Sequence, residues 1–210
     1  MTFETAWHLP LLAMLGVPGG LLVDQLARTL HGEPPIWGAR GEGWRRRVCL
    51  VGLPIAFGAG GFLYGPTPKA AVAAWYAGMF LLIALVDLEQ ELIPDRLVIA
   101  GLLTAPVTAT VWGISPVGMV LGAVVEFGFF FVSAWVARGA VKQGDVKLGA
   151  YLGAISGFPR AMYGLFLMSL VAAAASLVLV LVLRVKDWKD LIPFAPFMVI
   201  GTALALLSGR

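Results

Sequence analysis

The stretch AAVAAWYAGMFLLIALV, residues 70–86, contains seventeen residues without a charged side chain. Seven further apolar stretches follow one another along the 210-residue chain, which is 60% hydrophobic and 13% charged. A bilayer core about 30 Å thick needs roughly 20 apolar helical residues, so these runs predict membrane-spanning helices. The composition excludes an ordinary soluble domain and a disordered chain. We predict an all-α, polytopic transmembrane bundle of about eight spans, at residues 7–27, 48–64, 70–86, 97–114, 117–137, 148–158, 162–183 and 192–207.

The basic residues predict which side of the membrane each loop faces. If the N-terminus lies outside, twelve of the fifteen lysines and arginines fall in inner loops, and only Lys69, Arg160 and Arg210 lie outside. Positive residues concentrate in the cytoplasmic loops of membrane proteins. The net charge of +3 thus follows from topology, so we expect membrane lipid and no nucleic acid as a partner. We predict a single membrane-embedded domain over residues 1–210, with residues 28–47 as a short cytoplasmic loop.

Acidic side chains at membrane depth are costly to keep there, so each of them is a candidate for function. Four such residues occur, namely Asp24, Asp87, Glu126 and Asp145. Asp24 precedes Arg28 by four residues, and an ion pair on one helix face accounts for it. Glu126 lies in mid-span and is either a neutral, hydrogen-bonded acid or part of a proton or ion path.

Asp87 and Asp145 are expected at the same depth, just beneath the cytoplasmic surface. Asp87 ends the third span ahead of the helix break at Pro94, and Asp145 precedes the sixth span. Taken singly, each has an ordinary structural role, as a solvated helix end or as an N-cap residue. Two close carboxylates cannot easily both ionise, so one can serve as base and the other as acid to activate water against an amide. Gly144 would let an extended substrate come close, and Lys147 would add positive potential.

The chain resembles the prepilin peptidases, also called type IV leader peptidases, in three blocks that occur in the family's order. These blocks are Val86-Asp87 with LIPD at residues 92–95, GDVKL at 144–148 and IPFAPF at 192–197. The resemblance implies an intramembrane aspartyl protease of the bacterial inner membrane, with Asp87 and Asp145 as its two catalytic aspartates and no cofactor. Its substrates would be prepilin or pseudopilin precursors, cut near the cytoplasmic membrane face. The supporting or substrate-binding residues would be Gly144, Lys147, Asp95, Pro94, Pro193 and Pro196.

Two departures from the family pattern stand out. The second block usually begins Gly-x-Gly-Asp, whereas this chain has Lys142 in place of the first glycine. Bifunctional members carry an insert with paired cysteines between the first two spans, associated with methylation of the new N-terminus. Residues 28–47 contain no cysteine, so we expect cleavage without methylation.

Several residues keep an alternative role. Asp95 suits the first turn of a helix, where a carboxylate interacts well with the helix dipole. Pro193 and Pro196 either simply break the last helix or bring its broken turn near the site. The two histidines are not at zinc-ligand spacing, so no metal site is predicted. The alternative functions are a small proton- or cation-coupled transporter that uses the buried acids, and a catalytically silent relative that only binds pilin-like helices.

Overall fold

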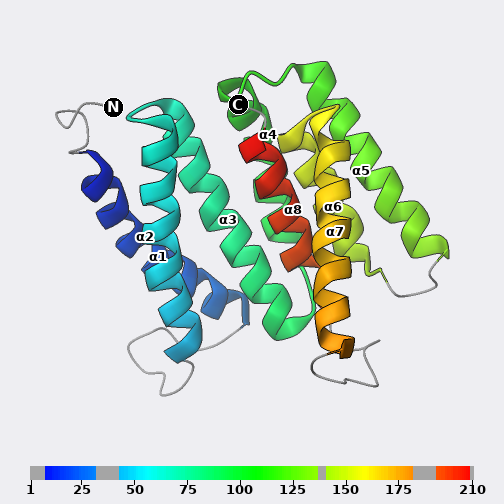
Figure 1. The fold of residues 1–210 in the computed structure, drawn as a ribbon, viewed down its shortest axis with the longest axis horizontal. Helices are drawn as coiled ribbons and strands as arrows, with labels where there is room; N and C mark the ends of the chain where they lie inside the picture. The colour runs from blue at the N-terminus through cyan, green and yellow to red at the C-terminus, as the bar shows by residue number, and fades with distance from the viewer. Residues whose placement is uncertain (1–7, 32–42, 137–140, 182–192, 209–210) are drawn as a thin grey trace. The chain divides into compact units, whose positions relative to one another are not determined.

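The computed structural model describes residues 8–31, 43–136, 141–181 and 193–208. Within these ranges the secondary structure is helical and contains no strand, which confirms the predicted all-α fold. The helices follow one another along the chain (Figure 1): α1 (His8–His31), α2 (Gly43–Tyr64), α3 (Pro68–Gln90), α4 (Asp95–Val111), α5 (Pro116–Val136), α6 (Gln143–Ser156), α7 (Arg160–Leu181) and α8 (Ala195–Ser208). Residues 32–42 of the predicted cytoplasmic loop lie outside the described residues.

Among the described residues, four helices are long and apolar enough to cross a membrane, judged by length and composition. They are α2, α3, α5 and α7, while α8 is apolar but shorter. A helical, multi-pass membrane protein is therefore supported. The number of eight spans and the outer position of the N-terminus stay predictions.

The chain forms two compact units, Met1–Val86 and Asp87–Arg210, and the boundary between them falls inside α3. The prediction of a single domain over residues 1–210 stays a prediction.

In the first unit, α1 and α2 pack closely through glycines. A Cβ on Gly20 would lie about 2.9 Å from the backbone carbonyl carbon of Cys49, and a Cβ on Gly16 would collide with the backbone of Pro54. Small residues at such contacts allow two helix backbones to approach. The sequence of α1 thus favours this pairing because Gly16 and Gly20, four residues apart, lie on one face of the helix.

The same unit contains a buried cluster of charged side chains. Asp24 accepts a hydrogen bond from Nε of Arg28 at 3.2 Å and another from Nε of Arg45 at 3.1 Å. All three side chains are buried. The predicted pair of Asp24 and Arg28 is confirmed, and the structure adds Arg45 from α2, a partner that helix periodicity alone could not reveal.

In the second unit, α6 contacts α4, α5, α7 and α8 (Figure 1). Ten of its fourteen residues are buried. Gly122 of α5 and Gly153 of α6 face each other so closely that a Cβ on either would meet the other's carbonyl oxygen. This short helix therefore packs among the other helices of its unit. The four neighbouring helices therefore fix the position of the first turn of α6.

Candidate active site

Asp87 lies in the last turn of α3 and is only 4% exposed. Its Oδ2 accepts a hydrogen bond from the backbone N–H of Ala195 at 3.0 Å. Ala195 is the first residue of α8, so the positive end of that helix faces the carboxylate. Pro193 lies two residues before this helix, and Pro196 lies in its first turn, where proline is well tolerated. Ala195, which lies between these two prolines, thus places a backbone donor against Asp87, and the supporting roles of Pro193 and Pro196 stay predictions.

The chain turns sharply after Asp87. The N–H of Glu91 donates to the carbonyl oxygen of Asp87 at 2.8 Å, and Glu91 has a φ of 51°. A residue in the left-handed region commonly ends a helix, although it is usually glycine. Pro94 then caps α4, whose first residue is Asp95. Asp95 thus occupies the first helical turn that the sequence predicts for it.

Asp145 lies in the first turn of α6 and is also only 4% exposed. Its Oδ2 accepts a hydrogen bond from the backbone N–H of Lys142 at 3.0 Å. The N-cap residue of α6 is Lys142, so the interpretation of Asp145 as the N-cap was wrong by three positions. A carboxylate that reaches back to the N-cap N–H still stabilises the start of the helix.

Burial raises the pKa of Asp145 from its ordinary value of 3.8 to about 6. The hydrogen bond from Lys142 opposes this rise, the charge of Asp87 adds to it, and the charge of Lys142 opposes it. The carboxyl groups of Asp87 and Asp145 thus lie near enough for their charges to interact. The charge of Lys142 acts on Asp87 as well. Two aspartates that are 58 residues apart in the sequence therefore form one electrostatic cluster with one lysine.

Three of the predicted supporting residues, Gly144, Lys147 and Asp95, make contacts at the starts of α6 and α4. A Cβ on Gly144 would be 3.1 Å from Cβ of Ile93, so the missing side chain lets the start of α6 pack against the turn that follows α3. Nζ of Lys147 lies 2.7 Å from Oδ1 of Asp95, and both side chains are exposed. This ion pair joins α6 to α4. The roles of Gly144 and Lys147 in substrate binding stay predictions.

Sequence reasoning missed three contributors to the site. Ala195 contributes through its backbone N–H, which no side-chain pattern reveals, although the proline block signals a helix start. Glu91 and Lys142 contribute through a salt bridge between them. The signal for Lys142 was its unusual place within the second block, and Glu91 had no signal of its own.

Glu126 lies deep in the second unit and is 2% exposed. Its Oε1 has no hydrogen-bond partner among the described residues, and both roles that the sequence suggests for Glu126, a neutral hydrogen-bonded acid or part of a proton or ion path, stay predictions. Gly164 of α7 lies nearby, because a Cβ placed on it would be 3.8 Å from this oxygen.

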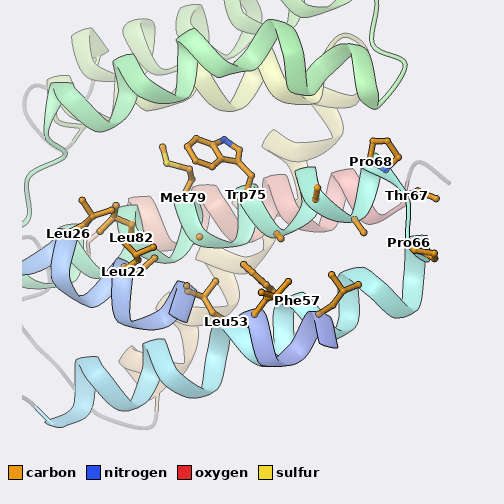
Figure 2. Close-up of a pocket in the computed structure, with 18 residues that line it drawn as sticks. Leu22, Leu26, Leu53, Phe57, Pro66, Thr67, Pro68, Trp75, Met79 and Leu82 are labelled. Atoms are coloured by element: carbon orange, nitrogen blue, oxygen red, sulfur yellow. The ribbon is translucent and has the colours of Figure 1, made fainter. Parts of the chain in front are cut away.

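A separate cavity of about 920 Å³ lies in the first unit, among α1, α2 and α3 (Figure 2). Leu22, Leu53, Phe57 and Met79 are among its lining side chains, and none of its lining residues is ionisable. The cavity therefore suits apolar groups and offers no side chain for acid–base chemistry. Within the described ranges, no group of three or more His, Cys, Asp and Glu side chains is placed to hold a metal ion.

A family model described as the type IV leader peptidase family matches residues 74–177, a region that includes both aspartates and Lys142. The chain belongs to the type IV leader peptidase family. Proteins named prepilin leader peptidase/N-methyltransferase are among its relatives within this family. No solved structure gives a significant match to the chain.

Three relatives show the extent of the similarity. The Bacillus subtilis (strain 168) protein is 32% identical over 157 residues, which cover 73% of this chain and 62% of that protein. The Burkholderia pseudomallei (strain 1026b) protein is 30% identical over 154 residues, covering 70% of this chain and 49% of the relative. The Pseudomonas putida protein is 32% identical over 155 residues, covering 70% of this chain and 52% of that protein. This leader peptidase family member thus spans about half to three fifths of these relatives.

Proposed function

We propose that the protein is an intramembrane aspartic endopeptidase that removes leader peptides from type IV prepilin-like or pseudopilin precursors. We place this reaction near the cytoplasmic face of the bacterial inner membrane. One observation carries the proposal: Asp87 and Asp145 are both buried, and their charges interact. The names of the relatives support a prepilin as the substrate.

In the proposed mechanism the two aspartates share one proton. The ionised carboxylate takes a proton from a water molecule as its oxygen attacks the scissile carbonyl carbon. The protonated carboxyl gives its proton to the carbonyl oxygen, which forms a tetrahedral diol. As the peptide bond breaks, the aspartate that took the proton from water gives it to the leaving amine, and the other aspartate takes a proton back from one hydroxyl of the diol. Oδ2 of each aspartate is held by a backbone N–H, and we assign Oδ1 of each to the water. These two N–H groups fix both carboxylates before the substrate arrives.

The substrate must expose its scissile carbonyl, so we propose that its apolar helix unwinds where the leader begins. The products are a free leader and a precursor with a new N-terminal amine. The absence of cysteine from residues 28–47 supports cleavage without methylation. The relatives carry the name N-methyltransferase as well, so this difference can be tested directly.

The test is cleavage of a purified prepilin by the purified protein in detergent or in vesicles, followed by mass spectrometry of the products. Asp87→Asn and Asp145→Asn should each lower the rate at least a hundredfold, the usual size of an acid–base contribution. Glu89→Gln, which changes an acid two residues from Asp87, is the control and should retain activity. Full activity in either aspartate variant would disprove the shared-proton mechanism. Addition of a methyl donor should leave the new N-terminus unmodified.

A transporter remains a second candidate because of the oxygen of Glu126 that has no hydrogen-bond partner in the described part of the chain. Buried acids of this kind occur along proton paths. Proton flux across vesicles that contain the protein, abolished by Glu126→Gln and without any proteolysis, would favour this candidate. Cleavage that persists in Glu126→Gln would favour the peptidase.

A further inference from the structure

Lys142 links the two segments that carry the aspartates. Its Nζ lies 2.9 Å from Oε2 of Glu91 and 2.9 Å from the backbone carbonyl oxygen of the same residue. The two residues are 51 positions apart in the sequence. Lys142 is the N-cap residue of α6, and Glu91 directly follows the last residue of α3. The double contact therefore joins the end of one helix to the start of another.

We propose that Lys142 is a positioning residue. By binding Glu91, it keeps the side chains of Asp87 and Asp145 in their positions relative to each other. This inference rests on the proposed function and adds a specific residue to it.

The path from one aspartate to the other is short and hydrogen-bonded at every step. The N–H of Glu91 donates to the carbonyl oxygen of Asp87 at 2.8 Å. Lys142 binds the side chain and the carbonyl of Glu91, and its own N–H holds the carboxylate of Asp145 at 3.0 Å. Lys142 thus binds the segment that follows Asp87 with its side chain, and it binds the carboxylate of Asp145 with its backbone N–H.

The backbone of Glu91 also needs support. A φ of 51° is sparsely populated by residues other than glycine, so holding Glu91 there is unfavourable without compensating contacts. The hydrogen bond from Lys142 to the carbonyl oxygen of Glu91 stabilises this conformation. The turn that follows Asp87 therefore depends on Lys142 for its shape.

The link contributes little to global stability, which makes the proposal testable. The side chains of Lys142 and Glu91 are 54% and 48% exposed. Exposed ion pairs contribute little to stability because water and salt screen them. If Lys142 acts by placing the aspartates, its loss will change the reaction much more than it changes unfolding.

The test compares Lys142→Met, which removes the charge and the donors, with Lys142→Arg, which keeps both. Cleavage kinetics, the pH profile and the unfolding temperature are measured for each variant, with Arg96→Met as the control for loss of a nearby exposed cation. Lys142→Met should lower kcat threefold or more, with KM within twofold and an unchanged unfolding temperature. Lys142→Arg should retain at least half of kcat.

The pH profile adds a readout that a purely structural role would not move. The charge of Lys142 opposes the rise in the pKa of Asp145, while the charge of Asp87 promotes it. Removal of the lysine charge should therefore move the limb of the profile that belongs to Asp145 to higher pH, and Lys142→Arg should leave this limb in place.

Three results would overturn the proposal: kcat of Lys142→Met within threefold of wild type, an equal loss in the Met and Arg variants, or a loss accompanied by a matching fall in the unfolding temperature. Failure of the proposed function would look different, because the wild-type protein itself would then not cleave a prepilin. If the wild-type protein cleaves a prepilin and Asp87→Asn does not, the results for the Lys142 variants test the positioning role alone.

Discussion

At the scale of single residues, the burial of Asp145 should reduce stability at neutral pH. The pKa of Asp145 rises from 3.8 to about 6 in the folded protein, mainly because the carboxylate is buried. Below pH 3.8 the group is protonated in both the folded and the unfolded state, so it has no effect on unfolding. As the pH rises toward 6, the unfolded chain ionises while the folded protein keeps its proton, so the free energy of unfolding falls.

Asp145→Asn removes this titration, so the variant should be more stable than wild type at about pH 7.5 by on the order of 3 kcal/mol, a difference that vanishes near pH 4. The measurement is the free energy of unfolding in detergent at both values, and equal differences at the two would contradict the prediction. Loss of activity together with a gain in stability is typical of a functional residue.

The residues show what the sequence could reveal about the site and what it could not. Asp87 and Asp145 could be proposed because a carboxylate at a membrane boundary is costly and therefore conspicuous. The donors that hold them are backbone N–H groups of Ala195 and Lys142, and every residue type except proline carries such a donor. Their roles depend on which helix ends meet, and one sequence alone does not specify that.

At the scale of helices, the start of α8 should matter as a source of one N–H. Proline fits the first position of a helix, so Ala195→Pro should keep the fold while it deletes the donor to Asp87. Hydrogen bonds to charged groups contribute about 1.5–3 kcal/mol, so the cleavage rate should fall at least tenfold. Ala195→Gly keeps the donor and is the control. Equal kinetics of the Pro and Gly variants would show that this contact is dispensable.

The contact between α5 and α6 gives a prediction about packing. A Cβ on Gly122 would meet the backbone of Gly153, so Gly122→Ala must push the two helices apart. Such overpacking costs about 1–3 kcal/mol in the free energy of unfolding. Gly128, on the same helix, has open space around it, and Gly128→Ala should stabilise the helix by about 0.5–1 kcal/mol. Chemical denaturation of the two variants should therefore give shifts of opposite sign, and shifts of the same sign would refute the packing argument.

The existence and order of the helices could be predicted because long apolar runs between charged breaks are typical of helices in membrane proteins. The ends of the helices were less predictable, and α6 begins five residues before its predicted apolar segment because its polar first turn carries Asp145. Hydropathy also does not separate a helix that faces lipid from one buried among other helices. The number of spans therefore needs an experiment.

At the scale of the whole molecule, the predicted topology places the two ends of α3 on opposite sides of the membrane. Cys49 is fully buried and is the single cysteine of the chain, so a Cys49→Ala background suits labelling. In intact cells, an impermeant thiol reagent should modify Lys69→Cys, while Arg96→Cys should react after permeabilisation alone. The reversed result would place the N-terminus inside. Labelling of both variants in intact cells would show that α3 does not cross the membrane.

The salt bridge between Lys142 and Glu91 is half-exposed, so its strength should depend on the salt concentration. The Debye length shrinks from about 10 Å at 0.1 M ionic strength to about 3 Å at 1 M, so added salt weakens attraction between exposed charges. Cleavage by the wild-type protein should therefore slow as potassium chloride is added, whereas Lys142→Met, already without the bridge, should respond less. A bacterium that accumulates ions under osmotic stress would then process its precursors more slowly.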